Sequence, residues 1–239
     1  MKNVTLLALD TATEACSVAL LRGGEKIHSE QFAQREHTKH ILPMVDEILA
    51  QAGIKLHQVD ALVFGRGPGS FTGVRIGAGI AQGLAFGANL PVIPVSNLAA
   101  MAQAAYVQYQ AENVLTAIDA RMNEVYFAYW QAQKVRSDFG TFLSWAPMIA
   151  EQVCSPSKVL EQVAQHQHDN AVLAGTGWAA YPQLIANLGK HTDITLPSAL
   201  YMLDLALPMW FAGETISPLE IEPIYLRNKV TWKKLPGRE

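Results

Sequence analysis

Two similar hairpin patterns, one near the start of the chain and one near its middle, constrain the fold most strongly. In the first, an apolar run ends in Asp10, and residues 16–21 read as a second strand after a short polar turn. In the second, an apolar run ends in Asp119 and is followed by a turn and the strand-like residues 124–130. Because both halves open in the same way, we predict an internally duplicated α/β protein with two subdomains of mixed sheet and flanking helices.

The rest of each half alternates between strand-like and helix-like segments. Gly23 and Gly24 are a two-residue turn signal between strands, and Ser96 is a favourable N-cap for a helix. The other predicted strands are 25–32, 61–65, 91–95 and 171–175, and the predicted helices are 37–52, 74–87, one from Ser96, 156–166, one from about Ala179, and 199–212. We divide the chain into a first subdomain (1–105, completed by helix 199–212), a second subdomain (106–198) and a tail (213–239).

Composition argues against several classes of function. Charged residues make up 16% of the chain, against about 25% in a typical soluble domain, so part of the surface is expected to be covered by a partner. The net charge of −3 gives no general attraction to nucleic acid, and Cys16 and Cys154 lack the spacing of a metal site. The basic tail from Arg227 reads either as a local contact with RNA or an acidic partner, or as a solvated end. Polar residues interrupt every apolar segment, so we expect a cytoplasmic protein without a membrane span.

The glycine-rich residues 65–77 raise the question of a phosphate-binding loop. Glycine-rich turns that open helices often bind phosphate through free backbone N–H groups. This segment, however, matches neither the Walker A spacing nor the dinucleotide fingerprint G-x-G-x-x-G. The alternative is that Gly73, Gly77 and Gly79 let the following helix pack closely against the sheet. We favour the packing interpretation.

Asp10 and Asp119 are the acidic residues at the ends of the two equivalent strands. Such residues beside a small turn can hold hydrated Mg²⁺ against a nucleotide phosphate. Aspartate is also common in turns because its side chain bonds the local backbone. The turn after Asp10 lacks a glycine that would let phosphate approach the backbone, so we favour a structural role for both residues.

Candidates for metal binding and nucleophilic catalysis are weak. His37 and His40 are spaced H-x-x-H, whereas helical metal sites usually use H-x-x-x-H, and position 41 is Ile. We therefore expect exposed or capping histidines. No G-x-S-x-G motif is present, and Ser70 and Thr72 are expected to cap the following helix.

The predicted helix 37–52 carries more apolar residues than one contact with a sheet requires. Ile41, Val45 and Ile48 lie on one face, while Leu42 and Leu49 are shifted around the helix. Together with the low charge content, this pattern favours a protein interface made by helices.

Four segments of the sequence together are specific to one known family. They are LALDTATEACSVAL, FGRGPGSFTGVRIG, IDARMNEVYFA and EPIYLRN, and the match runs from Asp10 to Arg227. On these segments the chain resembles the TsaB (YeaZ) family of bacterial tRNA threonylcarbamoyladenosine biosynthesis proteins. The resemblance implies a duplicated actin/Hsp70/sugar-kinase-like fold of the ribonuclease H-like type, in agreement with the repeated hairpin.

The resemblance also implies a role without catalysis. In that family, TsaB binds the paralogue TsaD, which holds a metal through H-x-x-x-H and modifies the adenosine next to the anticodon in tRNAs that read codons beginning with A. A TsaE-like ATPase joins the pair, the isolated chain is expected to form a homodimer, and tRNA is contacted only indirectly. We expect no catalytic residue, no metal and no cofactor, with a nucleotide at a partner interface left open. The interface candidates are Ile41, Leu42, Val45, Ile48, Leu49 and Arg75.

Two other functions remain open from the sequence. One is an ATP-binding or ATP-hydrolysing enzyme of the same fold, with Asp10 and Asp119 as phosphate-side residues and Gly175 and Gly177 in a turn that resembles an adenosine-side turn. The other, weaker, is a peptidase, for which the sequence shows neither a metal-binding histidine pair nor a catalytic triad.

Overall fold

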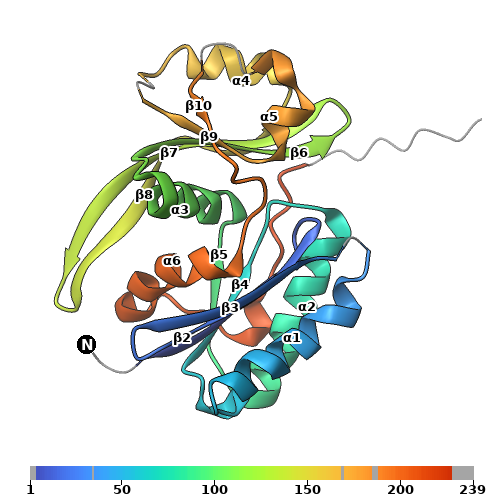
Figure 1. Ribbon diagram of the computed structural model, residues 1–239, viewed down its shortest axis with the longest axis vertical. Helices are drawn as coiled ribbons and strands as arrows, with labels where there is room; N and C mark the ends of the chain where they lie inside the picture. The colour runs from blue at the N-terminus through green and yellow to red at the C-terminus, as the bar shows by residue number, and fades with distance from the viewer. Residues whose placement is uncertain (1–3, 34, 168–169, 185–187, 228–239) are drawn as a thin grey trace, which may run out of the picture.

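The computed structural model describes residues 4–33, 35–167, 170–184 and 188–227, and its strands form two five-stranded sheets (Figure 1). The first sheet has the order β3-β2-β1-β4-β5, in which β1, β2 and β3 are antiparallel neighbours and β4 and β5 run parallel to β1. Its strands are β1 (Thr5–Asp10), β2 (Ala15–Arg22), β3 (Glu25–Phe32), β4 (Ala61–Gly65) and β5 (Val92–Val95).

The second sheet repeats the plan of the first. Its order, β8-β7-β6-β9-β10, places an antiparallel meander beside two parallel strands, as in the first sheet. Its strands are β6 (Asn113–Arg121), β7 (Glu124–Ser137), β8 (Gly140–Cys154), β9 (Val172–Ala174) and β10 (Lys190–His191). The predicted duplication is confirmed, and we call the parts built on the two sheets the first and second lobes.

Helices cover both faces of each sheet. They are α1 (His37–Gln51), α2 (Phe71–Ala88), α3 (Asn97–Tyr109), α4 (Pro156–Val163), α5 (Thr176–Ala180) and α6 (Ala199–Ala212), with short 3₁₀ turns at Leu56–Gln58, Pro182–Leu184 and Pro218–Glu220. In the first lobe, α1 and α2 pack on one face and α6 on the other. In the second lobe, α3 packs on one face and α4 and α5 on the other. Because α3 also contacts α6, these two helices lie between the sheets.

Strand β1 is buried on both faces, which explains its unbroken run of apolar residues. Leu7 and Leu9 point into the core shared with α1 and α2, while Leu6 and Ala8 point into the core shared with α6. Successive side chains of a strand point to opposite faces, so a strand covered on both sides must be apolar throughout.

Most of the predicted elements are confirmed, and the differences are local. Ser70 and Ser96 cap α2 and α3, each accepting a hydrogen bond from a backbone N–H three residues later. Thr72 lies inside α2, which begins at Phe71 rather than Val74. The prediction of a helix that starts at about Ala179 is wrong, because α5 begins at Thr176 and has five residues.

Strand β8 and the second half of β7 were not predicted. Together they form a long two-stranded arm that curves away from the second sheet toward α6 (Figure 1). Residues 131–141 of the arm are mostly exposed and polar, so they lack the apolar alternation that marks a half-buried strand. None of the described helices is long and apolar enough to span a membrane.

Candidate functional site

Asp10 lies at the end of β1, where the two lobes meet. Its side chain is 1% exposed, and Asn97 donates a hydrogen bond from Nδ2 to Asp10 Oδ1 at 2.7 Å. Burial raises the pKa of Asp10 to about 7, against the lowering effects of the Asn97 hydrogen bond and the backbone N–H of Ala12. Burial thus favours the protonated, uncharged form of this carboxyl group.

Asn97 ties Asp10 to the glycine-rich segment. Its Oδ1 accepts a hydrogen bond from the backbone N–H of Gly67 at 2.8 Å, while its amide nitrogen serves Asp10. A Cβ atom on Gly65 would lie 2.0 Å from Asp10 Oδ1, so only glycine fits beside this carboxyl group. The predicted structural role of Asp10 thus has a partner that the sequence did not reveal.

The glycine-rich segment packs directly on the turn that follows Asp10. The backbone N–H of Ser70 donates to the Ala12 carbonyl at 2.7 Å, and the Thr11 hydroxyl donates to the Gly73 carbonyl at 2.8 Å. A Cβ atom on Gly69 or Gly73 would lie 2.3 or 2.2 Å from a backbone oxygen of this turn. The segment is therefore packed by its own chain where a phosphate loop would present free N–H groups.

Two of the three glycines assigned to helix packing have that role. Gly73 and Gly77 face Thr11, and a Cβ atom on Gly77 would lie 2.8 Å from the Thr11 hydroxyl oxygen. The interpretation is wrong for Gly79, because a Cβ atom there would meet nothing within 4 Å and the residue is exposed.

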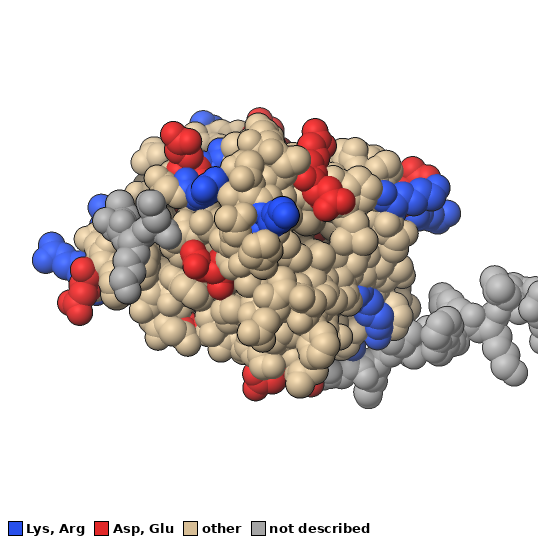
Figure 2. Space-filling model, turned by 90° about the horizontal axis from the view of Figure 1, so that it is seen from below, with Lys and Arg blue, Asp and Glu red and all other residues tan. Residues whose placement is uncertain are grey.

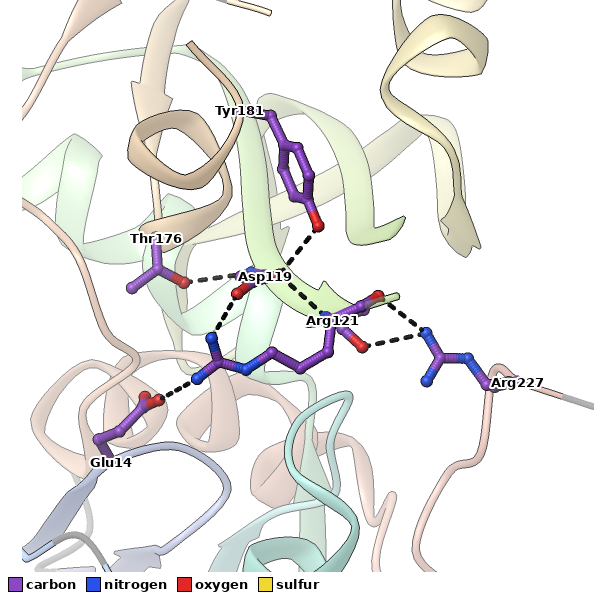
Figure 3. Close-up of polar contacts among 7 residues, drawn as sticks. Glu14, Asp119, Arg121, Thr176, Tyr181 and Arg227 are labelled. Carbon is purple, nitrogen blue, oxygen red and sulfur yellow. Dashed lines mark hydrogen bonds and ion pairs between the residues drawn. The ribbon is translucent and has the colours of Figure 1, made fainter. Parts of the chain in front are cut away.

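Asp119, the equivalent residue of the second lobe, is held by three neighbours (Figure 3). Arg121 donates from Nη1 to Asp119 Oδ2 at 2.9 Å, and the Tyr181 hydroxyl donates to Oδ1 at 3.3 Å. The backbone N–H of Asp119 donates to the Thr176 hydroxyl at 3.1 Å. Burial and the negative charge of Asp119 raise the pKa of Tyr181, so its hydroxyl keeps the proton that it donates.

Arg121 bridges the hairpin turns of the two lobes. Its Nη2 lies 3.5 Å from Glu14 Oε1 in the first turn, while Nη1 binds Asp119 in the second. We call the turns that follow Asp10 and Asp119 the two acidic turns. The guanidinium group thus places a positive charge between them, where the alternative nucleotide enzyme would need a metal ion and phosphates. Because Arg121 is 73% exposed, each ion pair contributes at most about 1 kcal/mol to stability.

The turn that carries Arg121 has an unusual backbone. Arg121, Met122 and Asn123 all have left-handed φ angles, at 61°, 58° and 59°, a conformation that costs roughly 1–2 kcal/mol per residue for L-amino acids. Arg227 stabilises the turn by donating to the Ala120 and Arg121 carbonyls at 3.0 and 3.4 Å. It also donates two hydrogen bonds to Glu124, at 2.6 and 3.1 Å. The rest of the predicted basic tail, 228–239, lies outside the described residues.

Gly175 and Gly177 are explained by the packing of α5 on β6. A Cβ atom on Gly175 would lie 2.0 Å from the Ala117 carbonyl oxygen, and one on Gly177 would lie 2.8 Å from the Ala117 side chain. Gly175 also has a φ of 118°, which favours glycine. This packing accounts for both residues without an adenosine ligand.

The two histidines have different environments. His37 is buried, and its Nε2 lies 2.7 Å from the Thr13 carbonyl oxygen, so it anchors α1 to the turn after Asp10. The expectation of an exposed or capping residue is therefore wrong for His37, whereas His40 is partly exposed and lies 3.7 Å from Glu36. Ile41 is fully buried, and the described residues contain no group of three His, Cys, Asp or Glu side chains placed to hold a metal.

The structure corrects the expected apolar surface of α1. Four of the six interface candidates belong to the core of the first lobe: Ile41, Val45, Ile48 and Leu49, each at most 7% exposed. Leu42 is 44% exposed, and Arg75 is exposed on α2 with its guanidinium stacked over the Phe71 ring at 3.3 Å. Of the six interface candidates, only Leu42 and Arg75 are exposed to a partner in this conformation.

Burial of Asp10 predicts a specific pH dependence of stability. The pKa of Asp10 is higher in the folded state than in the unfolded state. Its contribution to the free energy of unfolding therefore falls as pH rises from about 4 to about 7, and does not change further above that range. The full loss is on the order of 4 kcal/mol. We expect Asp10→Asn, which still accepts from Asn97, to match the wild type near pH 4.5 and to be more stable at pH 8. Urea unfolding at both pH values measures this, and an equal difference at both values would contradict it.

The fold and the site define a duplicated actin-like α/β protein in which the chain's own side chains engage both acidic turns. The family model for tRNA N6-adenosine threonylcarbamoyltransferase (TsaD) matches residues 25–217. The tRNA threonylcarbamoyladenosine biosynthesis protein TsaB of Haemophilus influenzae is 67% identical over 100% of both chains, and that of Escherichia coli is 49% identical over 98% of this chain and 99% of its own. The solved structure of YeaZ from Pseudomonas aeruginosa is 42% identical, covers 93% of this chain and 100% of its own, and has a TM-score of 0.80. The chain belongs to the TsaB family.

Proposed function

We propose that this chain supports the threonylcarbamoyl modification of the adenosine next to the tRNA anticodon as a non-catalytic partner of a TsaD-like transferase. Its relatives are named for that biosynthesis, and the transferase family model covers most of the chain. Asp10 is buried and accepts a hydrogen bond from Asn97 through Oδ1, although its Oδ2 has no partner among the described residues, and Asp119 is paired with Arg121. The observation that carries the proposal is the glycine-lined outer face of α2.

The outer face of α2 has three glycines at helical spacing. Gly79, Gly83 and Gly87 are exposed, and a Cβ atom on any of them would meet nothing within 4 Å. Glycine inside a helix costs about 1 kcal/mol relative to alanine. No contact among the described residues requires glycine at these positions, whereas a second helix approaching closely at this face would require small residues here.

Apolar side chains surround the glycine face. Phe86 on α2 is 69% exposed, and Leu219 in the adjacent 3₁₀ turn is 75% exposed. That turn is fixed to α2 by a hydrogen bond from the Gln82 amide to the Pro218 carbonyl at 2.9 Å. Figure 2 shows the underside of Figure 1, where α1 and α2 lie, with a broad area free of Lys, Arg, Asp and Glu. Such a surface fits a helix-mediated protein interface.

In this proposal Arg75, one turn before Gly79 on α2, and the exposed Leu42 of α1 also contact the partner. The same face pairs two copies of the isolated chain, and a TsaE-like ATPase joins the complex with the transferase. The low charge of the chain leaves recognition of tRNA to the partner.

Nucleoside analysis in cells tests the proposal. We expect threonylcarbamoyladenosine to fall in tRNA when the protein is depleted, and Asp10→Asn/Asp119→Asn to restore it, because neither carboxylate takes part in chemistry. Mass spectrometry of digested tRNA measures the modification. If a folded double variant binds the transferase yet fails to restore the nucleoside, the ATP-dependent enzyme is favoured instead. An unchanged level after depletion would contradict the proposed role.

A further inference from the structure

A cavity lies away from both the α2 face and the two acidic turns. It has a volume of about 770 Å³ and is enclosed by the β7–β8 arm, by α6 and by the start of α3. In Figure 1 the arm and the end of α6 lie on the left, whereas α1 and α2 lie on the right. This volume is within the range of about 300–1,000 Å³ that is typical of small-molecule sites.

Aromatic rings form much of the cavity wall. Phe139, near the tip of the arm, stacks on Phe211 of α6 with ring centres 4.5 Å apart, and Phe142 lies 5.8 Å from the same ring. Trp130 and Trp145 line the other side, and their indole N–H groups already donate within the protein, to Thr116 and Gln103. The rings therefore offer the cavity apolar faces and π-electrons rather than unsatisfied donors.

The charges at this cavity are predominantly negative. Its charged lining residues are Arg66, Asp138 and Glu214. Arg66 is paired through Nη2 with Glu151, 2.6 Å away, while its buried Nη1 has no partner among the described residues. Asp138 and Glu214 form no ion pair with any described residue. On the arm, Val135 and Ser137 line the cavity, while the alternate residues Lys134 and Arg136 do not.

Helix α6 adds to this negative potential. Its C-terminal end lines the cavity through Phe211 and Ala212, and no basic residue stands in its last turn. The carbonyl end of a helix carries a partial negative charge, which favours a cation nearby.

We propose that this cavity binds a small organic cation, an ammonium group carried on an aromatic or branched aliphatic body. The apolar body packs between the tryptophan side and the phenylalanine cluster. The ammonium group lies toward Asp138, Glu214 and the end of α6, where the phenylalanine rings contribute cation–π attraction. An anion of the same shape meets Asp138 and Glu214 and is repelled.

A matched pair of probes tests the charge preference directly. 2-Phenylethylamine and 3-phenylpropanoate share an aromatic body and carry opposite charges at neutral pH. We expect the amine to bind saturably with a Kd on the order of 1 mM and the carboxylate at least about tenfold more weakly. Two-dimensional NMR of the full chain reads binding from the indole N–H signals of Trp130 and Trp145, assigned with Trp→Phe variants.

Neutral substitutions locate the site. Asp138→Asn/Glu214→Gln is expected to weaken amine binding about tenfold, whereas Asp46→Asn/Glu47→Gln, which removes the same charge from exposed positions of α1, leaves it unchanged. Both pairs are surface changes that keep the fold. The proposal is overturned if the amine gives no saturable shift up to about 20 mM, if the carboxylate binds equally well, or if both variants behave alike.

Discussion

We expect Gly83→Leu to abolish binding to the TsaD-like partner while the isolated chain remains folded. Gly83 is exposed, and a Cβ atom there would meet nothing within 4 Å, so the new side chain starts from open space outside the core. A partner helix seated against the glycine face would be pushed outward by the leucine, with loss of most of its packing contacts. The change tests the interface without disturbing the first lobe.

A graded series separates binding from folding. Gly79→Ala and Gly83→Ala should each raise the free energy of unfolding by about 0.5–1 kcal/mol, because alanine is the better helix former. The same changes should weaken the complex, so stability and affinity move in opposite directions. Urea unfolding and calorimetric titration with the purified partner measure the two effects.

The control is an exposed helical residue in the other lobe. Glu161 lies on α4 and is 64% exposed, and Glu161→Leu adds a leucine of the same size without touching the glycine face. The Glu161→Leu variant should bind the partner with the affinity of the wild type. If Gly83→Leu also binds normally, the glycine face is not the interface. Val45→Asp would be uninformative, because Val45 is 2% exposed and a buried charge there would unfold the lobe.

The repeated hairpin could be predicted because its signal is local. Each strand of the repeat is a short run of apolar residues bounded by turn residues, and Asp10 and Asp119 mark equivalent ends. Helix spacing predicted α1 and its apolar faces but not their role, because Ile41, Val45 and Ile48, expected at a partner interface, lie in the core of the first lobe. It did not separate Leu42 from Leu49, because which flank of a helix the sheet covers depends on tertiary packing.

The contacts that define the site could not be predicted from local pattern. Asn97 meets Asp10 across 87 residues, and Arg227 meets Glu124 across 103 residues. Asn97 stands in no motif, and Arg227 lies in the segment EPIYLRN, which does not indicate what the side chain contacts. Both roles arise only when the two lobes are assembled. The arm of β7 and β8 was not predicted because its sequence lacks a local strand signal. Its residues are mostly exposed on both faces, so they need no apolar alternation.

One signal in the glycine-rich segment was present and was misinterpreted. Gly73 and Gly77 are four residues apart and share one face of α2, whereas Gly79, Gly83 and Gly87 share another. Helical spacing alone therefore separates the two sets, and the structure places the first against Thr11 and the second in solvent. Assigning Gly79 to the first set ignored this periodicity.

Gly73→Ala is expected to lower the free energy of unfolding by about 3 kcal/mol or more. A Cβ atom at this position would lie 2.2 Å from the Thr11 carbonyl oxygen and 2.5 Å from the Ser70 hydroxyl oxygen. The backbone would have to move apart, which would also break the hydrogen bond from the Thr11 hydroxyl to the Gly73 carbonyl. Gly79→Ala, the same chemical change six residues further along the helix, should be stabilising.

Urea unfolding of both variants decides what the glycine-rich segment is for. A large loss for Gly73→Ala beside a gain for Gly79→Ala means that the segment holds α2 against the turn after Asp10. If Gly73→Ala instead unfolds like the wild type but fails to restore threonylcarbamoyladenosine, the glycine is required by a ligand and not by packing. Because the two outcomes differ in stability before any activity is measured, loss of protein in the cell cannot be mistaken for loss of a binding site.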